Sequence, residues 1–156
     1  MLRVTEHIAA AKSGSLPTPF DILVLEHDAR RLRRKLLVLV HGDEVMVDFP
    51  QTRTLEHGDR LALDDGRNVE VIAAEEDLYE VRGRDPAHLI QLAWHLGNRH
   101  LSAQLEKDRI LIKRDHVIRT MLLGLGAELH EISEPFTPEY GAYHAHGEHS
   151  HALLAK

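Results

Sequence analysis

The stretch Asp85-Pro-Ala-His-Leu-Ile-Gln-Leu-Ala-Trp-His-Leu-Gly-Asn-Arg-His100 predicts a helix that is followed by a histidine. Asp85 can cap the free N–H groups of the first turn, and Pro86 suits the first helical position, where its missing donor costs nothing. Gly97-Asn98 provides a stop signal, so we expect a helix from about Pro86 to Leu96. His100 then lies on non-helical backbone.

The predicted helix has an apolar stripe that we expect to face a core, made of Leu89, Ile90, Ala93 and Leu96. The opposite, wetter side carries His88, Gln91 and His95. A histidine just after a helix is often a surface residue or a cap for the helix carbonyls. His100 by itself therefore leaves open whether it is a metal ligand.

The C-terminal residues contain a second group of histidines, which consists of His144, His146, His149 and His151. Ala, Gly, Ser and Glu surround them, and such a composition cannot bury enough apolar surface to fold alone. We therefore expect a disordered tail over residues 143–156, whose paired His-x-His groups suit metal chelation. An expression tag is the alternative, but tags are usually uninterrupted histidines, whereas these are spaced.

Composition limits the function classes. The chain has 156 residues, a formal charge of −6 and a pI near 6.1, which argue against nucleic-acid binding. It has no cysteine, so disulfides and thiolate ligands are excluded and any metal must use imidazole, carboxylate or carbonyl groups. We expect a soluble cytoplasmic protein, because no secretory signal and no apolar run of about 20 residues is visible.

Residues 1–74 predict a small all-β domain. Short apolar or alternating runs are separated by turn signals, as in Glu44 to Phe49, which follows His41-Gly42-Asp43. Nothing here resembles a nucleophile with its base or a phosphate-binding loop, so we expect a binding or positioning domain. The basic residues Arg30, Arg31, Arg33, Arg34 and Lys35 fit either a solvated turn and strand face or a docking patch for an acidic partner.

Residues 75–142 predict a ferredoxin-like domain, so the expected fold class is α+β. The order is strand, helix, strand, strand, helix, strand, which places both helices on one face of a four-stranded antiparallel sheet. Asp115 should cap the second helix, and Gly126 should end it in the left-handed conformation. The expected buried stripe of this helix consists of Val117, Ile118, Met121, Leu122 and Leu125.

Three runs of this sequence are distinctive together: Trp94-His-Leu-Gly-Asn-Arg-His100, Asp115-His-Val-Ile-Arg-Thr-Met-Leu, and Pro135-Phe-Thr-Pro-Glu-Tyr-Gly-Ala-Tyr143. In their order and spacing they resemble the urease accessory metallochaperones of the UreE family. The resemblance implies a cytoplasmic homodimer that delivers Ni²⁺ to apo-urease during active-site assembly, with the urease apoprotein and the urease accessory GTPase complex as partners. It also implies a peptide-binding β domain over residues 1–74, a ferredoxin-like metal-binding domain over residues 75–142 and a histidine-rich tail.

The resemblance also implies roles for individual residues. His100 occupies the position of the family's essential metal ligand, the tail histidines add ligands, and His95 and His116 match secondary positions. Some relatives carry a histidine two residues before the His116 position and a cysteine near that of Gly83. Here the first position is Arg114, and the cysteine is absent.

Coordination chemistry supports the same reading independently. One imidazole cannot hold Ni²⁺, Zn²⁺ or Cu²⁺ tightly, so His100 needs partners, which a symmetric dimer and the tail could supply. Zn²⁺ and Cu²⁺ are expected to compete for the site, since histidine ligands usually prefer Cu²⁺ to Ni²⁺.

Two hypotheses remain at this point: a nickel carrier, and a peptide-binding scaffold in the urease assembly complex with incidental histidines. An enzyme is a distant third, because no cluster of three ligands with a general base, such as His-Glu-x-x-His, is visible in the sequence.

Overall fold

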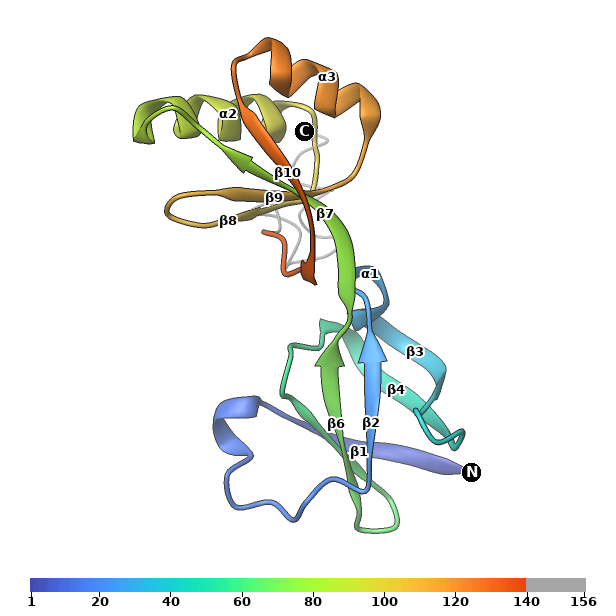
Figure 1. Ribbon diagram of the computed structural model, residues 1–156. Coiled ribbons are helices and arrows are strands. Elements are labelled where there is room, and N and C mark those ends of the chain that lie inside the picture. The colour runs from blue at the N-terminus through green and yellow to red at the C-terminus, as the bar shows by residue number, and fades with distance from the viewer. Residues whose placement is uncertain (140–156) are drawn as a thin grey trace, which may run out of the picture. The chain divides into compact units, whose positions relative to one another are not determined.

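The structure is a computed structural model, and it describes residues 1–139 of the chain. The backbone divides into two compact units, of which the first covers Met1–Ala74 and the second begins at Glu75. We call them the β domain and the α+β domain and describe each separately (Figure 1). Among the described residues, no helix is long and apolar enough to cross a membrane.

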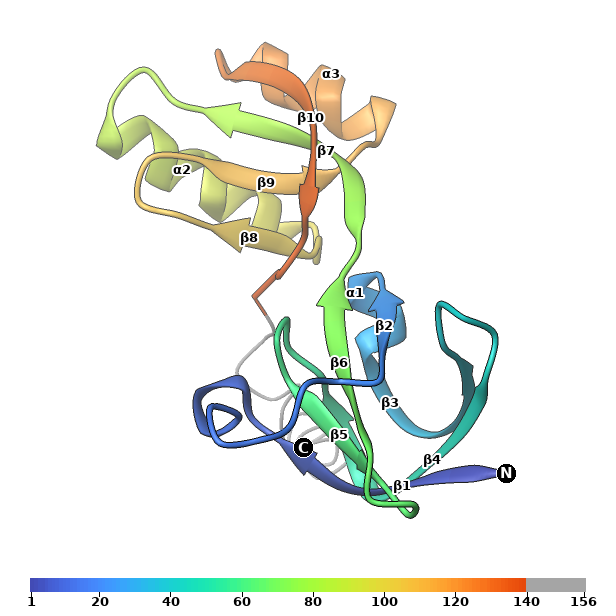
Figure 2. The ribbon, with the colours of Figure 1, turned by 60° about the horizontal axis from the view of Figure 1, so that its bottom comes forward.

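The β domain is built from six strands in one sheet of order β2-β6-β5-β1-β4-β3 (Figure 2). The strands are β1 (Leu2–Ile8), β2 (Asp21–Leu25), β3 (Arg31–Val38), β4 (Glu44–Thr54), β5 (Arg60–Leu63) and β6 (Asn68–Ala73). A 3₁₀ turn, η1 (Ala10–Lys12), follows β1, and a short helix, α1 (His27–Arg30), joins β2 to β3. The pairs β1–β4 and β2–β6 are parallel, and the other pairs are antiparallel.

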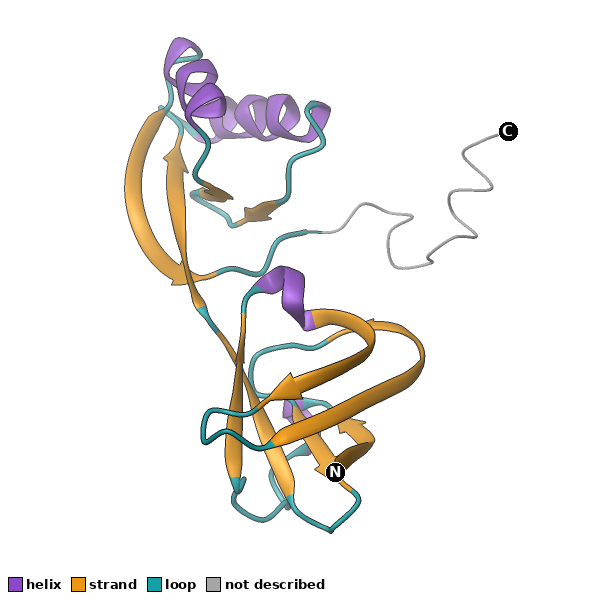
Figure 3. Cartoon of the chain, turned by 90° about the vertical axis from the view of Figure 1, so that its right-hand side faces the viewer, coloured by secondary structure: helices purple, strands orange, loops and turns teal. Residues whose placement is uncertain are grey.

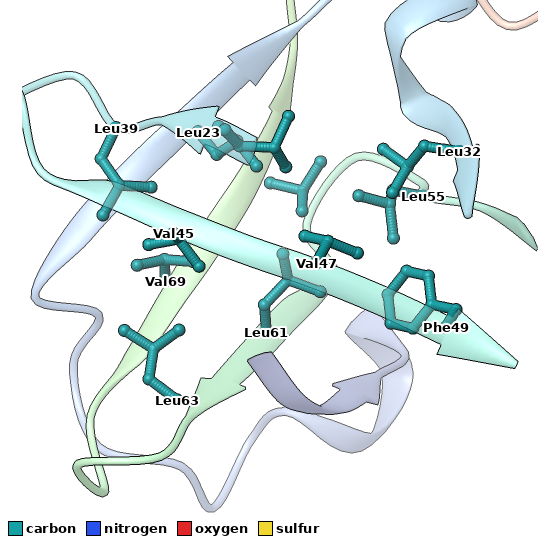
Figure 4. Close-up of a cluster of buried hydrophobic side chains, with 12 residues drawn as sticks. Leu23, Leu32, Leu39, Val45, Val47, Phe49, Leu55, Leu61, Leu63 and Val69 are labelled. Atoms are coloured by element: carbon teal, nitrogen blue, oxygen red, sulfur yellow. The ribbon is translucent and has the colours of Figure 1, made fainter. Parts of the chain in front are cut away.

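The core of the β domain follows from alternation along its strands. In β4 the side chains of Val45, Val47 and Phe49 are buried, as the alternating pattern predicts, while the residues between them face outward. Figure 4 shows these three side chains among leucines and valines from the neighbouring strands. Burying a side chain of this size contributes about 1.5–3 kcal/mol, so this alternation is a main source of stability for the domain.

The basic cluster lies on α1 and β3 but is not uniformly solvated. Arg33, Arg34 and Lys35 are exposed on β3, which is an edge strand of the sheet. Arg30 is only 2% exposed at the end of α1, so the prediction of a solvated residue is wrong there. The backbone carbonyl of Arg30 accepts a hydrogen bond from the N–H of Leu55, which places this residue inside the domain.

The α+β domain has the predicted ferredoxin-like order. Its elements are β7 (Glu75–Arg82), α2 (Pro86–Asn98), β8 (Ala103–Leu105), β9 (Ile110–Lys113), α3 (His116–Gly124) and β10 (Glu128–Pro135). The sheet order is β10-β7-β9-β8, with every neighbouring pair antiparallel. Both helices pack on one face of the sheet (Figure 3), so the expected α+β class and helix placement are confirmed.

The longest pairing of this domain joins its first and last strands. In β7 and β10 every position from Arg82 opposite Glu128 to Glu75 opposite Pro135 is in register. The first strand of the domain, β7, therefore lies inside the sheet, and the last strand, β10, lies beside it at the edge.

The helix caps agree with the prediction. The carboxylate of Asp85 accepts a hydrogen bond from the N–H of His88, and that of Asp115 accepts one from the N–H of Ile118. Gly126 has a φ of 83°, the left-handed conformation expected where a helix ends.

The predicted helix faces are right at most positions. In α2, Leu89 and Leu96 are buried and Ala93 packs against the core, as expected, but Ile90 is 70% exposed, and His88 and Leu92 are buried instead. In α3, Ile118 and Leu122 are buried and Met121 and Leu125 pack against the core, as expected, whereas Val117 is 60% exposed and its predicted burial is wrong.

The chain continues past β10 along the face of the sheet that the helices leave open (Figure 1). We call residues 136–139 the strap. Phe136 is fully buried against Leu78 and Leu111, whose side chains point to this face because residues alternate along a strand. The strap thereby covers the second apolar face of the sheet.

Candidate metal-binding site

His100 lies two residues beyond α2, with an exposed side chain. Its backbone φ is 58°, and among the described residues it is the only one other than glycine with a positive φ. Its N–H donates to the carbonyl of Gly97 at 3.0 Å, and the N–H of Leu101 donates to the carbonyl of Leu96 at 3.4 Å. This pair of bonds is the Schellman ending of a helix, in which the left-handed position is usually glycine.

The conformation of His100 has an energetic cost. A left-handed backbone costs a residue with a Cβ atom roughly 1–2 kcal/mol relative to the helical region. Residues in such conformations concentrate at functional sites, where the surrounding structure holds them in place. A histidine where glycine would be relaxed thus points to a use for its imidazole, which the ending of α2 presents to solvent.

The other predicted ligands lie at separate places in the domain. His95 is half-buried in the last turn of α2, where its ring meets the edge of the Trp94 ring with centroids 5.2 Å apart. His116 is exposed at the first position of α3. Within residues 1–139 no group of three or more His, Asp or Glu side chains could hold a metal ion. His144, His146, His149 and His151 lie outside the described residues.

Arg114 and Gly83, at which the resemblance suggested further ligands, have structural roles here. The guanidinium of Arg114, which directly follows β9, donates to the carbonyls of Leu78 in β7 and Ile132 in β10, so it ties the end of β9 to both of these strands. At Gly83, an added Cβ atom would lie 2.7 Å from the backbone nitrogen of Leu89. A larger side chain cannot enter there unless α2 shifts.

The end of the described chain approaches the segment that follows His100. The N–H of Glu139 donates to the carbonyl of Ala103 at 2.8 Å, and the N–H of Thr137 donates to the side-chain oxygen of Gln104 at 2.9 Å. The last described residue, Glu139, therefore lies next to Ala103 at the start of β8, and Ala103 is three residues along the chain from His100. Sequence reasoning did not identify this proximity, although Phe136 between Pro135 and Pro138 is an apolar signal that could have suggested an anchor.

A charged cluster fixes the end of β10, just before the strap. The guanidinium of Arg109 lies 2.9 Å from Glu134, 3.0 Å from Glu106 and 2.8 Å from Glu80. Hydrogen bonds from Arg109 lower the pKa of Glu134, and hydrogen bonds from Arg82 and Arg109 lower that of Glu80. These carboxylates raise the pKa of Arg109 in turn, so the cluster is charged at neutral pH.

The outer side of α2 presents large apolar side chains to solvent. Ile90 is 70% exposed and Trp94 is 65% exposed, and the two are one helical turn apart on the same ridge. We call this pair the α2 ridge. Adjacent exposed apolar residues of this size, one of them a tryptophan, are typical of surfaces that contact another protein.

The fold and this site together define a two-domain α+β protein with exposed histidines. The sequence pattern of the UreE urease accessory protein N-terminal domain matches residues 3–74, and that of the C-terminal domain matches residues 76–154. The chain belongs to the UreE family of urease accessory proteins, which confirms the resemblance seen in its motifs. The family is a chaperone-type family and not one of enzymes, as expected.

Individual relatives cover almost the whole chain. The urease accessory protein UreE of Rhizobium leguminosarum bv. trifolii is 56% identical over 151 residues, which are 97% of this chain and 77% of the relative. That of Agrobacterium fabrum is 54% identical over 151 residues, 97% of this chain and 92% of the relative. Urease accessory protein UreE 1 of Brucella suis is 58% identical over 125 residues, 80% of this chain and 77% of the relative.

Proposed function

We propose that this protein is a cytoplasmic nickel carrier that delivers Ni²⁺ to apo-urease while the urease active site is assembled. The observation that carries the proposal is His100, an exposed imidazole at the left-handed end of α2, where glycine would cost less. The names of the relatives, which are urease accessory proteins, give the setting in which such a ligand would be used.

The site is proposed to form between two copies of the chain. A single imidazole binds Ni²⁺ weakly, but a two-fold axis that passes near His100 would bring two of them together. The α2 ridge supports this arrangement, since Ile90 and Trp94 lie on α2, which ends two residues before His100, and both are exposed in the single chain. Burial of the ridge against its symmetry copy would drive the homodimer.

The tail is proposed to complete the coordination shell. His144, His146, His149 and His151 follow the strap in the sequence, and the last residue of the strap, Glu139, bonds to Ala103, three residues after His100. His95 and His116 are proposed as secondary binding positions. Zn²⁺ and Cu²⁺ have the same ligand preference and should compete with Ni²⁺, so selectivity must come from metal supply and from the partner.

The two domains are proposed to have different roles, metal binding and partner docking. Residues 75–142 bind the metal, residues 143–156 add ligands, and residues 1–74 dock on the urease apoprotein and the urease accessory GTPase complex. A metal site that is assembled from two chains and their tails is open to ligand exchange, which suits delivery better than permanent binding.

Calorimetric titration with NiCl₂ tests the carrier. The parent chain is compared with His100→Ala and with His130→Ala, a matched exposed histidine on β10. We expect His100→Ala to remove the tightest binding event and His130→Ala to keep it. Tight binding by His100→Ala that equals the parent would refute the assignment.

A scaffold that brings the assembly partners together is the second candidate, and the surface of β3 favours it. This edge strand exposes Arg33, Arg34 and Lys35 beside the apolar Leu36 and Val38, a combination that suits an acidic partner. In a urease activation assay with limiting nickel, a carrier requires His100, and excess nickel should partly rescue His100→Ala. A scaffold instead requires β3: activation should fail in the double variant Arg33→Glu, Arg34→Glu at every nickel concentration.

A further inference from the structure

One segment of the β domain is apolar on both of its faces. It is Leu36-Leu-Val-Leu-Val40, which forms the end of β3 and the start of the turn that follows. Leu37 and Leu39 belong to the core and are 5% and 2% exposed (Figure 4). In a strand whose other side is solvated, the alternate positions are usually polar. Here they are Leu36, Val38 and Val40, which are 40%, 61% and 55% exposed.

A second strand extends this exposed apolar surface. The N–H of Val40 donates to the carbonyl of Ile22 at 3.1 Å, so the chain after β3 lies against β2, the strand at the other edge of the sheet. Val24, two residues further along β2, is 44% exposed. Single exposed apolar residues are normal, whereas a group that crosses two strands is typical of a surface that another molecule covers. We call this group the outer stripe; it consists of Val24, Leu36, Val38 and Val40.

Cations lie at one end of the outer stripe. Arg34 is in the same row as Leu36 and Val38, because every second residue of a strand points to the same side. Arg33 and Lys35, on either side of it, are also exposed. In the part of the chain that the structure describes, none of these three cations forms an ion pair. We call them the basic end of the stripe.

The carboxylates of the neighbouring strand do not cancel this charge. Asp48 of β4 is the register partner of Arg34, and Glu44 is that of Val38. Three cations against these two carboxylates leave the surroundings of the stripe positive, although the whole chain has a formal charge of −6. An acidic group of a partner is therefore attracted to this surface, and a basic group is not.

Protection of the sheet edge explains only part of this pattern. Charged side chains on an edge strand prevent unwanted pairing with other chains, and the basic end lies on the edge strand β3. Exposed aliphatic residues have the opposite effect, because they favour association. The outer stripe is therefore not accounted for by edge protection, and it has the composition of an interface with apolar residues next to charged ones.

We propose that the outer stripe docks an amphipathic segment of an assembly partner, which places apolar side chains on the stripe and carboxylates beside the basic end. The apolar contacts supply most of the affinity, and the charges orient the segment and speed its association. This inference rests on the docking role proposed for residues 1–74 and gives that role a surface and a partner chemistry. It does not involve His100.

The test measures binding of a labelled peptide to the full-length chain. The probe is fluorescein-labelled Glu-Glu-Glu-Val-Leu-Val, and its controls are Lys-Lys-Lys-Val-Leu-Val and Glu-Glu-Glu-Ser-Ser-Ser. The double variant Val24→Thr, Val38→Thr makes the stripe polar and keeps the β-branched shape of both side chains. Val117→Thr, the same change at an exposed position of α3, is the matched control. Fluorescence anisotropy measures binding, and thermal unfolding shows that each variant keeps its fold.

Docking on the outer stripe predicts a dependence on both parts of the probe. The parent should bind the acidic apolar peptide more tightly than either control peptide, and added NaCl should weaken this binding because it screens exposed charges. Val24→Thr, Val38→Thr and Arg33→Glu, Arg34→Glu should each weaken binding by about fivefold or more, as at interface residues that matter. Val117→Thr should bind like the parent.

Three outcomes would overturn the inference. They are equal binding of the three peptides, parental affinity in the Val24→Thr, Val38→Thr variant, and a shift of that variant toward monomer in sedimentation velocity. The last outcome would assign the stripe to a contact between copies of this chain.

The proposed function is tested apart from the stripe. His100→Ala should bind the peptide like the parent, so a nickel titration that refutes the carrier leaves the peptide result standing. The docking role of residues 1–74 fails separately, if Arg33→Glu, Arg34→Glu supports full urease activation.

Discussion

The imidazole of His88 joins the two helices of the α+β domain, because its Nε2 atom donates to the carbonyl of Leu125 at 2.8 Å. Its Nδ1 atom accepts the backbone N–H of Arg84 at 2.9 Å, so both ring nitrogens are used. A neutral imidazole satisfies both bonds at once. His88 is therefore a structural residue between the start of α2 and the end of α3, and it is not available to a metal.

Replacing His88 by alanine should destabilise the protein. The change leaves the carbonyl of Leu125 and the N–H of Arg84 without their partner, which costs about 1–3 kcal/mol for each group that stays buried. Urea unfolding should therefore show a lower midpoint for His88→Ala, whereas His116→Ala, at an exposed position, should match the parent. Equal midpoints for the two variants would contradict this role.

Replacing His100 by glycine should separate stability from metal binding. Glycine adopts the left-handed conformation without strain, whereas alanine does not, so we expect His100→Gly to be more stable than His100→Ala by about 1 kcal/mol. Both variants should lose tight Ni²⁺ binding. Denaturant unfolding of the apoproteins measures the stability difference, and calorimetry measures Ni²⁺ binding. If His100→Ala is as stable as His100→Gly, residue 100 carries no backbone strain.

Acid should weaken the α+β domain through the Arg109 cluster. The pKa values of Glu80 and Glu134 are lowered in the folded protein, so their contribution is fully present above the unfolded carboxyl value of about 4.3 and is lost as pH falls through the lower folded values. Arg109→Met should remove much of this pH dependence. Urea midpoints for parent and variant, measured between about pH 7 and pH 3, should differ most at neutral pH and converge in acid.

The control for the acid prediction lies in the β domain. Hydrogen bonds from Arg67 lower the pKa of Asp65, so Arg67→Met should change the acid response of that domain and leave the α+β domain as it was. Parallel acid curves for the parent and Arg109→Met would show that the cluster does not contribute to the pH dependence.

The α2 ridge should control the oligomeric state. Trp94 is exposed in the single chain, and buried tryptophans commonly dominate the affinity of protein interfaces. We expect Trp94→Ala to shift the proposed homodimer toward monomer in sedimentation velocity and to weaken Ni²⁺ binding in proportion. Leu105→Ala, an exposed leucine in β8, is the matched control. A dimer that is unchanged by Trp94→Ala would place the two-fold axis elsewhere.

Local patterns predicted much of the fold. Asp85 and Asp115 cap the helices because short polar side chains accept hydrogen bonds from free N–H groups within a few residues. In β4, the alternation of apolar and polar residues indicates which face of the strand is buried. The order of strands and helices then leaves few topologies, and the ferredoxin-like arrangement follows.

The features that the sequence did not predict depend on contacts between residues far apart in the chain. The sequence pattern placed His88 on the polar side of α2. In the structure its ring donates to the carbonyl of Leu125 at the end of α3, 37 residues away in the sequence, so His88 is buried and Ile90 faces outward. Phe136 follows the last strand, and only the folded sheet reveals that it has an apolar face left to cover. His100 was found as a candidate ligand, but its left-handed backbone depends on how α2 ends.

The pairing of Glu75 with Pro135 also governs when the chain can fold. These register partners are 60 positions apart (135 − 75), and contacts of such separation form late because a long loop must close first. During synthesis, β7 leaves the ribosome long before its partner β10, while every strand of the β domain has already emerged. The β domain can thus complete its sheet before β10 has been synthesised, whereas the sheet of the α+β domain can be completed only after β10 has emerged.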